Sequence, residues 1–314
     1  MGKASRTKAD SSRRERIAAQ RAAERRAEQR RRILIASGSI IAVVAIVVAF
    51  IVVKANSKPP AASASNGPTG AALASVVSDL TSVPASTTDA IGNGGGQVTA
   101  TPKAVTNGTP LTANGKPEML YMGAEYCPYC AAERWAMIQA LSRFGTFSGL
   151  STIHSAAANG AGQAEPYPNT PTFTFHGSTY TSKYLTFTPV ESETNIPDKA
   201  SGGYTALETP TKAQTALLTK YDVPPYVPSG SEDAIPFIYF GGKYIVAGAS
   251  YSPQVLAGLS WSKIASEVKN NPNSDVAKAV VGTANYITAA ICKITGNQPA
   301  SACTSTIQSL EKSL

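Results

Sequence analysis

Two cysteines separated by two residues stand where an apolar segment gives way to a helical pattern. The motif Cys127-Pro128-Tyr129-Cys130 follows the apolar run 119–122 and precedes a helical pattern over 131–141. A helix N-terminus carries partial positive charge, which stabilises a thiolate on the first cysteine. The spacing also allows the two sulfurs to close a small, reversible disulfide. The sequence therefore predicts a strand, a turn and a helix with redox chemistry at the turn.

Other functions of a paired-cysteine motif need further residues. A zinc site requires a second cysteine pair or nearby histidines, but Cys292 and Cys303 have ten residues between them, and His154 and His176 form no ligand motif. Haem attachment requires a histidine after the second cysteine, where Ala131 stands instead. We therefore predict no metal and no cofactor other than the cysteine pair. A purely structural disulfide in the motif remains an alternative.

The positive charge of the chain lies in one block. The 314 residues carry a net charge of +8, and residues 1–32 alone hold 12 Lys or Arg and 4 Asp or Glu. The remainder is therefore electrically balanced, which gives no support to nucleic-acid binding by the main body. An RNA-binding role for the basic block has no support either, because no aromatic residues are interleaved with it.

Directly after this block comes a stretch of 21 residues without a charge, 33–53. A helix of that length spans roughly 31 Å, enough for the hydrocarbon core of a bilayer. A cleaved signal peptide and a buried core helix are the alternatives, and the length and the 32 preceding residues favour a permanent anchor. The basic flank predicts a cytoplasmic N-terminus in contact with membrane lipid.

This topology predicts four segments of a single-pass protein of the cell membrane. They are a basic cytoplasmic segment (1–32), a transmembrane anchor (33–53), a flexible linker rich in Pro, Ala and Ser (54–70) and an extracytoplasmic domain (71–314). All four cysteines fall in the last segment, as expected for an oxidising compartment.

Apolar periodicity and turn residues predict the elements of the domain. We expect strands at 97–99, 119–122, 151–154, 172–175, 237–240 and 244–247. We expect helices at 71–80, near 211–220, from Ser252 to about 269 with a break near 258–260, and from 275 to 295, where Gly296 would end the last one. The rest of 183–223 reads as irregular.

The order of these elements resembles the thioredoxin superfamily: a strand, the cysteine motif and its helix, then Ile235-Pro236, a strand, a tight turn, a strand and a helix. The resemblance implies an α/β thioredoxin-like fold. It implies that Pro236 is cis, opens a core strand and faces the cysteines, with the backbone of Ile235 beside an extended substrate peptide. The long interval between Cys130 and Pro236 implies an insertion before the cis-proline strand.

The same resemblance implies roles for the residues of the motif. Cys127 would be the exposed attacking thiolate, and Cys130, more buried, would resolve the mixed disulfide. Tyr126 and Tyr129 would form the rim of a substrate groove. Glu125 is a candidate for proton transfer, although a solvated residue at the strand end is the simpler interpretation. The Pro-Tyr dipeptide is the one glutaredoxins carry, which favours an intermediate or oxidising potential.

A second cysteine pair lies near the C-terminus. Cys292 is near the end of a predicted helix and Cys303 follows a turn, so a structural disulfide would join the helix to its returning tail. A second redox pair is the alternative. The segments 123–135, 141–145 and 289–292, together with Cys303, resemble an uncharacterised family of membrane-anchored proteins, number 929 among the domains of unknown function. This resemblance covers about residues 70–310.

These observations together predict a membrane-anchored, extracytoplasmic thiol–disulfide oxidoreductase acting on secreted or envelope proteins. Its partners would be protein thiols and disulfides and, by analogy, a quinone-linked membrane protein that reoxidises it. An envelope reductase or isomerase is the alternative within redox chemistry. A non-catalytic thioredoxin-like scaffold with structural disulfides is the alternative outside it.

Overall fold

The computed structural model describes residues 67–314. The predicted basic segment (1–32), the predicted anchor (33–53) and all but the last residues of the predicted linker (54–70) lie outside this range. From residue 67 onwards, no helix combines the length and the apolar character needed to cross a bilayer. The domain begins by residue 68, because the Thr152 hydroxyl donates a hydrogen bond to the Pro68 carbonyl.

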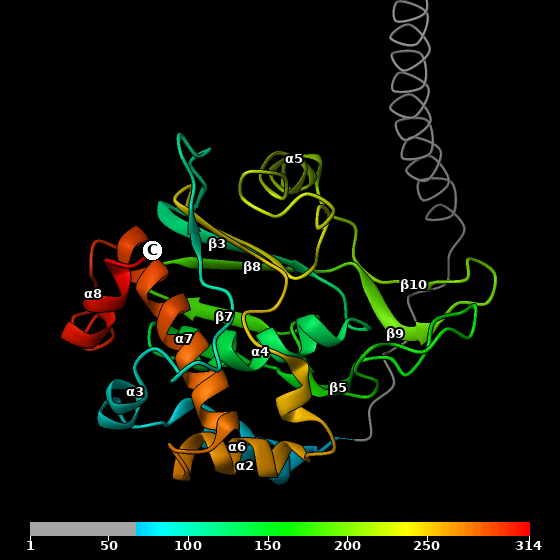
Figure 1. Ribbon diagram of the computed structural model, residues 1–314, viewed down its shortest axis with the longest axis horizontal. Helices are drawn as coiled ribbons and strands as arrows, with labels where there is room; N and C mark the ends of the chain where they lie inside the picture. Colours follow the sequence, from blue (N-terminus) through cyan, green and yellow to red (C-terminus); the bar gives the residue numbers. More distant parts are fainter. Residues whose placement is uncertain (1–66) are drawn as a thin grey trace, which may run out of the picture. The chain divides into compact units, whose positions relative to one another are not determined.

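The described part of the chain is a mixed α/β protein (Figure 1). Its helices are α2 (Gly70–Thr81), α3 (Ala85–Ile91), α4 (Pro128–Leu141), α5 (Lys212–Tyr221), α6 (Trp261–Asn270), α7 (Asp275–Ile294) and α8 (Ser305–Glu311), with a 3-10 turn, η1 (Pro253–Leu256). Its strands are β1 (Lys103–Ala104), β2 (Thr112–Ala113), β3 (Lys116–Gly123), β4 (Gly145–Ser148), β5 (Ser151–His154), β6 (Pro171–Thr174), β7 (Thr179–Ser182), β8 (Thr186–Glu191), β9 (Glu193–Pro197), β10 (Tyr204–Ala206), β11 (Phe237–Phe240) and β12 (Tyr244–Ala247).

The main sheet has β3 at its centre. β8 runs parallel to β3 on one side, while β11 runs antiparallel on the other and is followed by β12 and β1, also antiparallel. The short β2 pairs with the first residues of β3. Three small two-stranded sheets, β4–β7, β5–β6 and β9–β10, lie between α4 and α5 along the chain. The main sheet therefore combines one parallel pair, β3 and β8, with the antiparallel strands β11, β12 and β1.

Side chains alternate across this sheet and build two cores. Met119 and Tyr121 of β3 belong to the larger core, which the apolar faces of α4 and α7 complete. Leu120 and Met122 point to the opposite face, where Leu217 of α5 covers them. Figure 1 shows α5 on one side of β3 and β8, and α4 and α7 on the other. Because both faces are covered, the strands are apolar at successive positions.

Most predicted elements are confirmed. The hairpin strands at 237–240 and 244–247 match β11 and β12, and the predicted helix at 275–295 matches α7, with Gly296 directly after its C-cap at φ 65°. The strand predicted at 97–99 is wrong, because these residues belong to an irregular segment in which the Thr99 amide donates to the Ser250 carbonyl.

The interpretation of 183–223 as irregular apart from one helix is also wrong. The stretch contains β8, β9 and β10 in addition to α5. β8 contains Pro189, and proline lacks the amide that a central strand needs. β8 lies at the edge of the main sheet and pairs with β3 alone, so one of its sides needs no donors. The sequence pattern cannot reveal this edge position.

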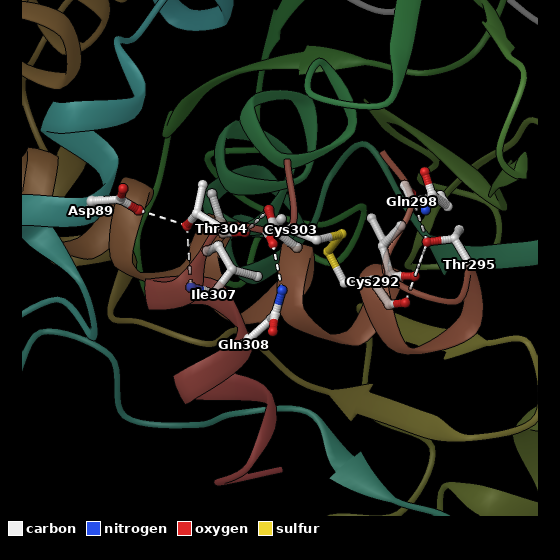
Figure 2. The surroundings of a disulfide bond; sticks show 11 residues. Asp89, Cys292, Thr295, Gln298, Cys303, Thr304, Ile307 and Gln308 are labelled. Atoms are coloured by element: carbon white, nitrogen blue, oxygen red, sulfur yellow. Dashed lines mark hydrogen bonds between the residues drawn. A yellow bond between two sulfur atoms is a disulfide. The ribbon is translucent and has the colours of Figure 1, made fainter. Parts of the chain in front are cut away.

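The predicted C-terminal disulfide is present (Figure 2). Cys292 on α7 and Cys303 in the turn before α8 form an S–S bond of 2.00 Å. The Gln308 side chain donates to the Cys303 carbonyl at 2.9 Å, and the Thr304 hydroxyl, which caps α8, donates to Asp89 at 2.8 Å. The disulfide therefore fixes α8 to α7, while the hydrogen bond to Asp89 connects it to α3.

Candidate active site

The two cysteines of the motif lie at the start of α4, immediately after β3 and a short turn. Cys127 is the N-cap residue of the helix, and its sulfur accepts a hydrogen bond from the Cys130 backbone amide at 3.3 Å. Pro128 occupies the first helical position, where its missing amide costs nothing. The predicted placement at a helix N-terminus is confirmed. The two cysteines are not bonded to each other.

Neither sulfur is openly exposed. Cys127 is 4% exposed and Cys130 is fully buried. The expectation of an exposed Cys127 is therefore wrong, although the predicted order of burial is confirmed. The cause is the loop before β11, because the Ile235 carbonyl lies 3.7 Å from the Cys127 sulfur and accepts its hydrogen bond.

The predicted juxtaposition of the proline loop and the cysteines is present. The Ile235–Pro236 bond is cis, and Phe237 directly begins β11. Ile235 also lines a pocket of about 370 Å³, together with Tyr129, Tyr167 and residues of the loop 248–253. The pocket walls carry no charged side chain. The pocket therefore offers only uncharged groups, and it reaches Cys127 through Ile235 alone.

The two tyrosines of the motif region contact different parts of the structure. Tyr129 is 38% exposed, packs edge to face against Tyr167 with ring centroids 5.8 Å apart, and lines the pocket. Tyr126 instead stacks on Tyr204 at 4.1 Å, and the Tyr204 hydroxyl donates to Glu165. Tyr129 therefore occupies a groove position beside Ile235, whereas Tyr126 connects the cysteine turn to β10.

The surroundings of the two cysteines shift the pKa values of their thiols in opposite directions. Burial raises the pKa of the Cys127 thiol, but hydrogen bonds from the Cys130 side chain and backbone and the charge of Arg134 lower it, so that it lies below its ordinary value. Burial raises the pKa of Cys130 well above its ordinary value, and the hydrogen bond to Cys127 raises it further. The Cys127 thiol is therefore the more acidic of the two, and the Cys130 thiol keeps its proton more firmly.

Glu125 lies in the core beside the cysteine turn. It is 1% exposed, so its interpretation as a solvated residue is wrong. The Thr174 hydroxyl donates to one of its carboxylate oxygens, while the other oxygen is buried without a hydrogen-bond partner among residues 67–314. Burial raises the pKa of Glu125 to about 7, against the lowering effect of Thr174. Glu125 can therefore hold or release a proton near neutral pH.

The sequence analysis missed a buried ion pair next to the cysteines. Arg134 of α4 and Glu191 at the end of β8 are both fully buried and joined by two hydrogen bonds of 2.8 and 2.6 Å. A third bond from Arg134, at 2.7 Å, reaches the Ala124 carbonyl just before the motif. The signal available in sequence was the position of Arg134, four residues after Cys130 on the same helix face. Glu191 had no such signal.

A buried carboxylate on α4, Glu133, binds the loop 248–253, several residues of which line the pocket. Glu133 accepts hydrogen bonds from the Ser250 amide at 2.8 Å and its hydroxyl at 2.9 Å. The neighbouring Tyr251 hydroxyl donates to the Ala132 carbonyl at 2.6 Å. Burial raises the pKa of Glu133 to about 7. These contacts attach the loop 248–253 to the same helix that carries the cysteines.

The two histidines lie apart from the cysteines. His154 packs edge to face on Trp261 at 4.5 Å, and His176 lies 2.6 Å from Glu208 on the surface. Among residues 67–314, no group of three or more His, Cys, Asp or Glu side chains is arranged to hold a metal ion. A further cavity of about 470 Å³ lies beside β5, and none of the predicted site residues lines it.

The described chain is thus a mixed α/β protein with two unlinked cysteines at a helix N-terminus beneath a proline loop. A family model described as a domain of unknown function, DUF929, matches residues 103–293. The match covers more than half of the chain and includes the cysteine motif, the proline loop and most of α7. The chain belongs to this family, as its sequence suggested. No curated protein and no solved structure is significantly similar to it.

Proposed function

We propose that the protein is a membrane-anchored, extracytoplasmic thiol–disulfide oxidoreductase with a thioredoxin-like fold. The observation that carries the proposal is the pair of environments at the start of α4, a Cys127 thiol with a lowered pKa and a buried Cys130 thiol with a raised one. A nucleophile and a resolving partner of this kind are what disulfide exchange needs. Anchoring and the extracytoplasmic location rest on the apolar segment 33–53 and its basic flank.

The topology of the main sheet supports the thioredoxin-like assignment. β3 leads into the cysteine helix and pairs in parallel with β8, which follows that helix. β11 and β12 form the antiparallel half, and the proline before β11 faces the cysteines. The small sheets β4–β7, β5–β6 and β9–β10 are the proposed insertion, and they supply Tyr204 and the segment with Tyr167 beside the cysteine turn.

In the proposed reaction, the oxidised Cys127–Cys130 disulfide accepts two electrons from a folding client. A client thiolate attacks the Cys127 sulfur, the Cys127–Cys130 bond breaks, and Cys130 leaves with the electron pair and takes up a proton. A second client thiolate then attacks the client sulfur bonded to Cys127, which forms the client disulfide and releases the Cys127 thiolate. The low pKa of Cys127 makes it a good leaving group in this second step.

The cycle closes when the reduced pair passes its two electrons to an oxidant. We propose a membrane protein linked to a quinone, which would take two electrons and two protons for each disulfide restored. A membrane-tethered domain would be held at the surface where such a partner resides. We propose that Glu125, two residues before Cys127 and with a pKa of about 7, exchanges the proton during the cycle.

Trapping of mixed disulfides tests the proposal directly. In cells that express the full-length protein, a Cys130→Ser variant should accumulate covalent complexes through Cys127, because the resolving thiol is gone. A Cys127→Ser variant is the matched control and should accumulate none. Complexes that collapse on reduction and contain envelope proteins would support the proposal. The absence of any such complex from Cys130→Ser, with the protein present and folded, would refute it.

The reduction potential of the Cys127–Cys130 pair separates the proposed oxidant from the alternatives. An oxidant should equilibrate in glutathione buffers near the potentials of strong disulfide donors, and a reductase near those of thioredoxins, about 150 mV lower. A pair that glutathione buffers cannot reduce would instead indicate a structural disulfide in a scaffold protein.

A further inference from the structure

Arg134 lies directly behind the cysteine turn. It is four residues beyond Cys130, and side chains on a helix lean towards its N-terminus, so the guanidinium reaches back towards the motif. Its bond to the Ala124 carbonyl, at 2.7 Å, places one end of the guanidinium against the turn that delivers Cys127. Its charge acts on both sulfurs and favours the thiolate on each.

The partner carboxylate lies on the other side of this guanidinium. Glu191 receives two bonds from Arg134 and also accepts from the Phe175 amide at 3.4 Å. Its carboxylate is therefore shared between Arg134 and the Phe175 amide. The remaining nitrogen of Arg134, Nη1, is buried without a hydrogen-bond partner in the described part of the chain. The positive charge of Arg134 is thus incompletely compensated.

A buried ion pair of this kind needs an explanation other than stability. Taking two charges out of water costs about as much as their attraction returns, and an apolar pair of similar volume is often equally stable. The Tyr121 ring, with its centroid 5.9 Å from the guanidinium carbon, completes an apolar cover over Arg134. Water is excluded, and electrostatic effects on nearby groups are correspondingly strong.

We infer that Arg134 is the positioning residue that sets the redox potential of the Cys127–Cys130 pair, and that Glu191 moderates it. The inference rests on the proposed function and adds the group that fixes the direction of exchange. A cation beside the sulfurs stabilises the reduced form as thiolate and leaves the neutral disulfide unaffected. Arg134 therefore makes the pair more oxidising, and Glu191, which opposes its charge, makes it less so.

The exchange used for the test balances without other reagents. Reduced protein and glutathione disulfide give the Cys127–Cys130 disulfide and two glutathione thiols, so that two electrons leave the cysteine pair and each glutathione sulfur gains one electron and one proton. Stabilising the Cys127 thiolate shifts this equilibrium towards reduced protein. The midpoint of Cys127 alkylation against pH reports the same stabilisation without any client or redox partner.

Three variants of the purified full-length protein separate charge from structure. Arg134→Gln combined with Glu191→Gln removes both charges and keeps groups able to hydrogen-bond. It should raise the alkylation midpoint of Cys127 by about one pH unit, a factor of about ten in the thiolate equilibrium. It should shift the glutathione equilibrium about tenfold towards the protein disulfide, or about 30 mV. Glu191→Gln alone should move both quantities in the opposite direction, and Arg134→Lys should stay within about threefold of the parent.

Arg143→Gln is the matched control. It is a second arginine, just after the end of α4 and hydrogen-bonded to Gln139, and it is not among the groups that act on the cysteines. It should leave both measurements unchanged. If the double variant does not fold, the single Glu191→Gln variant tests the inference by the direction of its two shifts.

Opposite shifts in Glu191→Gln and in the double variant would support the inference. Folded variants with unchanged midpoints and equilibria, or with shifts in the same direction, would overturn it and leave the pair a structural link between α4 and β8. These outcomes are independent of mixed-disulfide trapping. A protein that forms no mixed disulfides yet shows the opposite shifts would refute the proposed function and keep this inference.

Discussion

The two cysteine pairs of this chain carry the same thiol groups but lie in different surroundings. Cys292 and Cys303 lie in the larger apolar core and are bonded to each other. Cys127 and Cys130 lie outside that cluster, are unlinked, and stand at a helix N-terminus with Arg134 behind them. The first environment holds its two sulfurs in a disulfide. The second stabilises a thiolate on Cys127 through hydrogen bonds and charge.

This difference is what the proposed function requires of a domain that combines a permanent disulfide with an exchangeable cysteine pair. A disulfide whose reduced form gains nothing from its surroundings resists reduction. A cysteine pair whose reduced form is stabilised transfers its disulfide readily to other thiols. Substitutions in or near either cysteine pair test this comparison. The predictions below run from the largest expected effect to the smallest.

Removal of the nucleophile should have the largest effect. We expect Cys127→Ser to lower the rate of thiol alkylation in the native, reduced protein near pH 7 by a factor of a hundred or more, because the remaining Cys130 is buried and protonated. Mass spectrometry after timed iodoacetamide treatment measures this rate for each cysteine. Cys292 and Cys303 should stay unmodified in both proteins. Rapid labelling of Cys130 in the variant would contradict the division of roles.

Removal of the C-terminal disulfide should cost stability and leave the reactive pair unchanged. The bond joins residues 11 apart, and closing a loop of this size stabilises a fold by about 3 kcal/mol in the chain-entropy model. We therefore expect Cys292→Ala with Cys303→Ala to lower the free energy of unfolding in urea by about that amount. The alkylation midpoint of Cys127 should not move. A shift of that midpoint would show that the two pairs are coupled.

The two buried carboxyl groups around the reactive pair should make stability depend on pH. Burial raises the pKa values of Glu125 and Glu133 to about 7, above the ordinary value near 4.5, so the folded protein binds more protons than the unfolded chain between these values. Their contribution is therefore greatest at low pH and is lost as pH rises through 7. We expect the free energy of unfolding to fall by about 1–3 kcal/mol from pH 5 to pH 8.

Glutamine substitutions identify the source of this pH dependence. Glu133→Gln and Glu125→Gln should each flatten the profile of unfolding free energy against pH. Glu267→Gln should not flatten it, because Glu267 lies on α6, where its contact with Lys263 lowers its pKa. A profile that stays steep when both buried groups are replaced would assign the effect to other residues.

Crowding the cysteine pair should lower the free energy of unfolding by no more than the loss of the C-terminal disulfide does. A Cβ atom added to Gly123 would lie 2.1 Å from the Tyr121 hydroxyl oxygen and 3.1 Å from the Cys130 sulfur. Gly123→Ala should therefore lower the free energy of unfolding by about 1–3 kcal/mol, since buried neighbours must move. Gly203→Ala is the control, because its nearest neighbour would be 3.7 Å away. Equal unfolding free energies for the two variants would contradict the close packing.

The parts of this site that the sequence could predict are those with local signals. Cys127, Cys130 and the cap of α4 follow from one short motif, and Ile235-Pro236 follows from its place before a hairpin. The main hairpin and α7 follow from their apolar periodicity. These features depend on residues close together in the chain, so a single sequence contains them.

The missed parts depend on contacts between distant segments. Glu191 reaches Arg134 across 57 positions, and its strand contains a proline that obscures the pattern. Glu125 and Glu133 looked like ordinary helix and strand-end residues, because burial is set by the packing of β6 and of the loop at Ser250. Burial decided the chemistry of the site, and burial is the property that a local pattern predicts least well.

The smallest expected effect on stability belongs to the one large apolar side chain that stands exposed among residues 67–314, Tyr129. Tyr129→Ala removes an edge contact with Tyr167 and one wall of the pocket beside Ile235, so the free energy of unfolding should change by less than about 0.5 kcal/mol. The rate of disulfide transfer to an uncharged peptide with two cysteines should nevertheless fall several-fold. The rate with glutathione, too small to fill the pocket, should stay constant. Equal losses with both substrates would mean that Tyr129 acts on the sulfurs and does not contact the client.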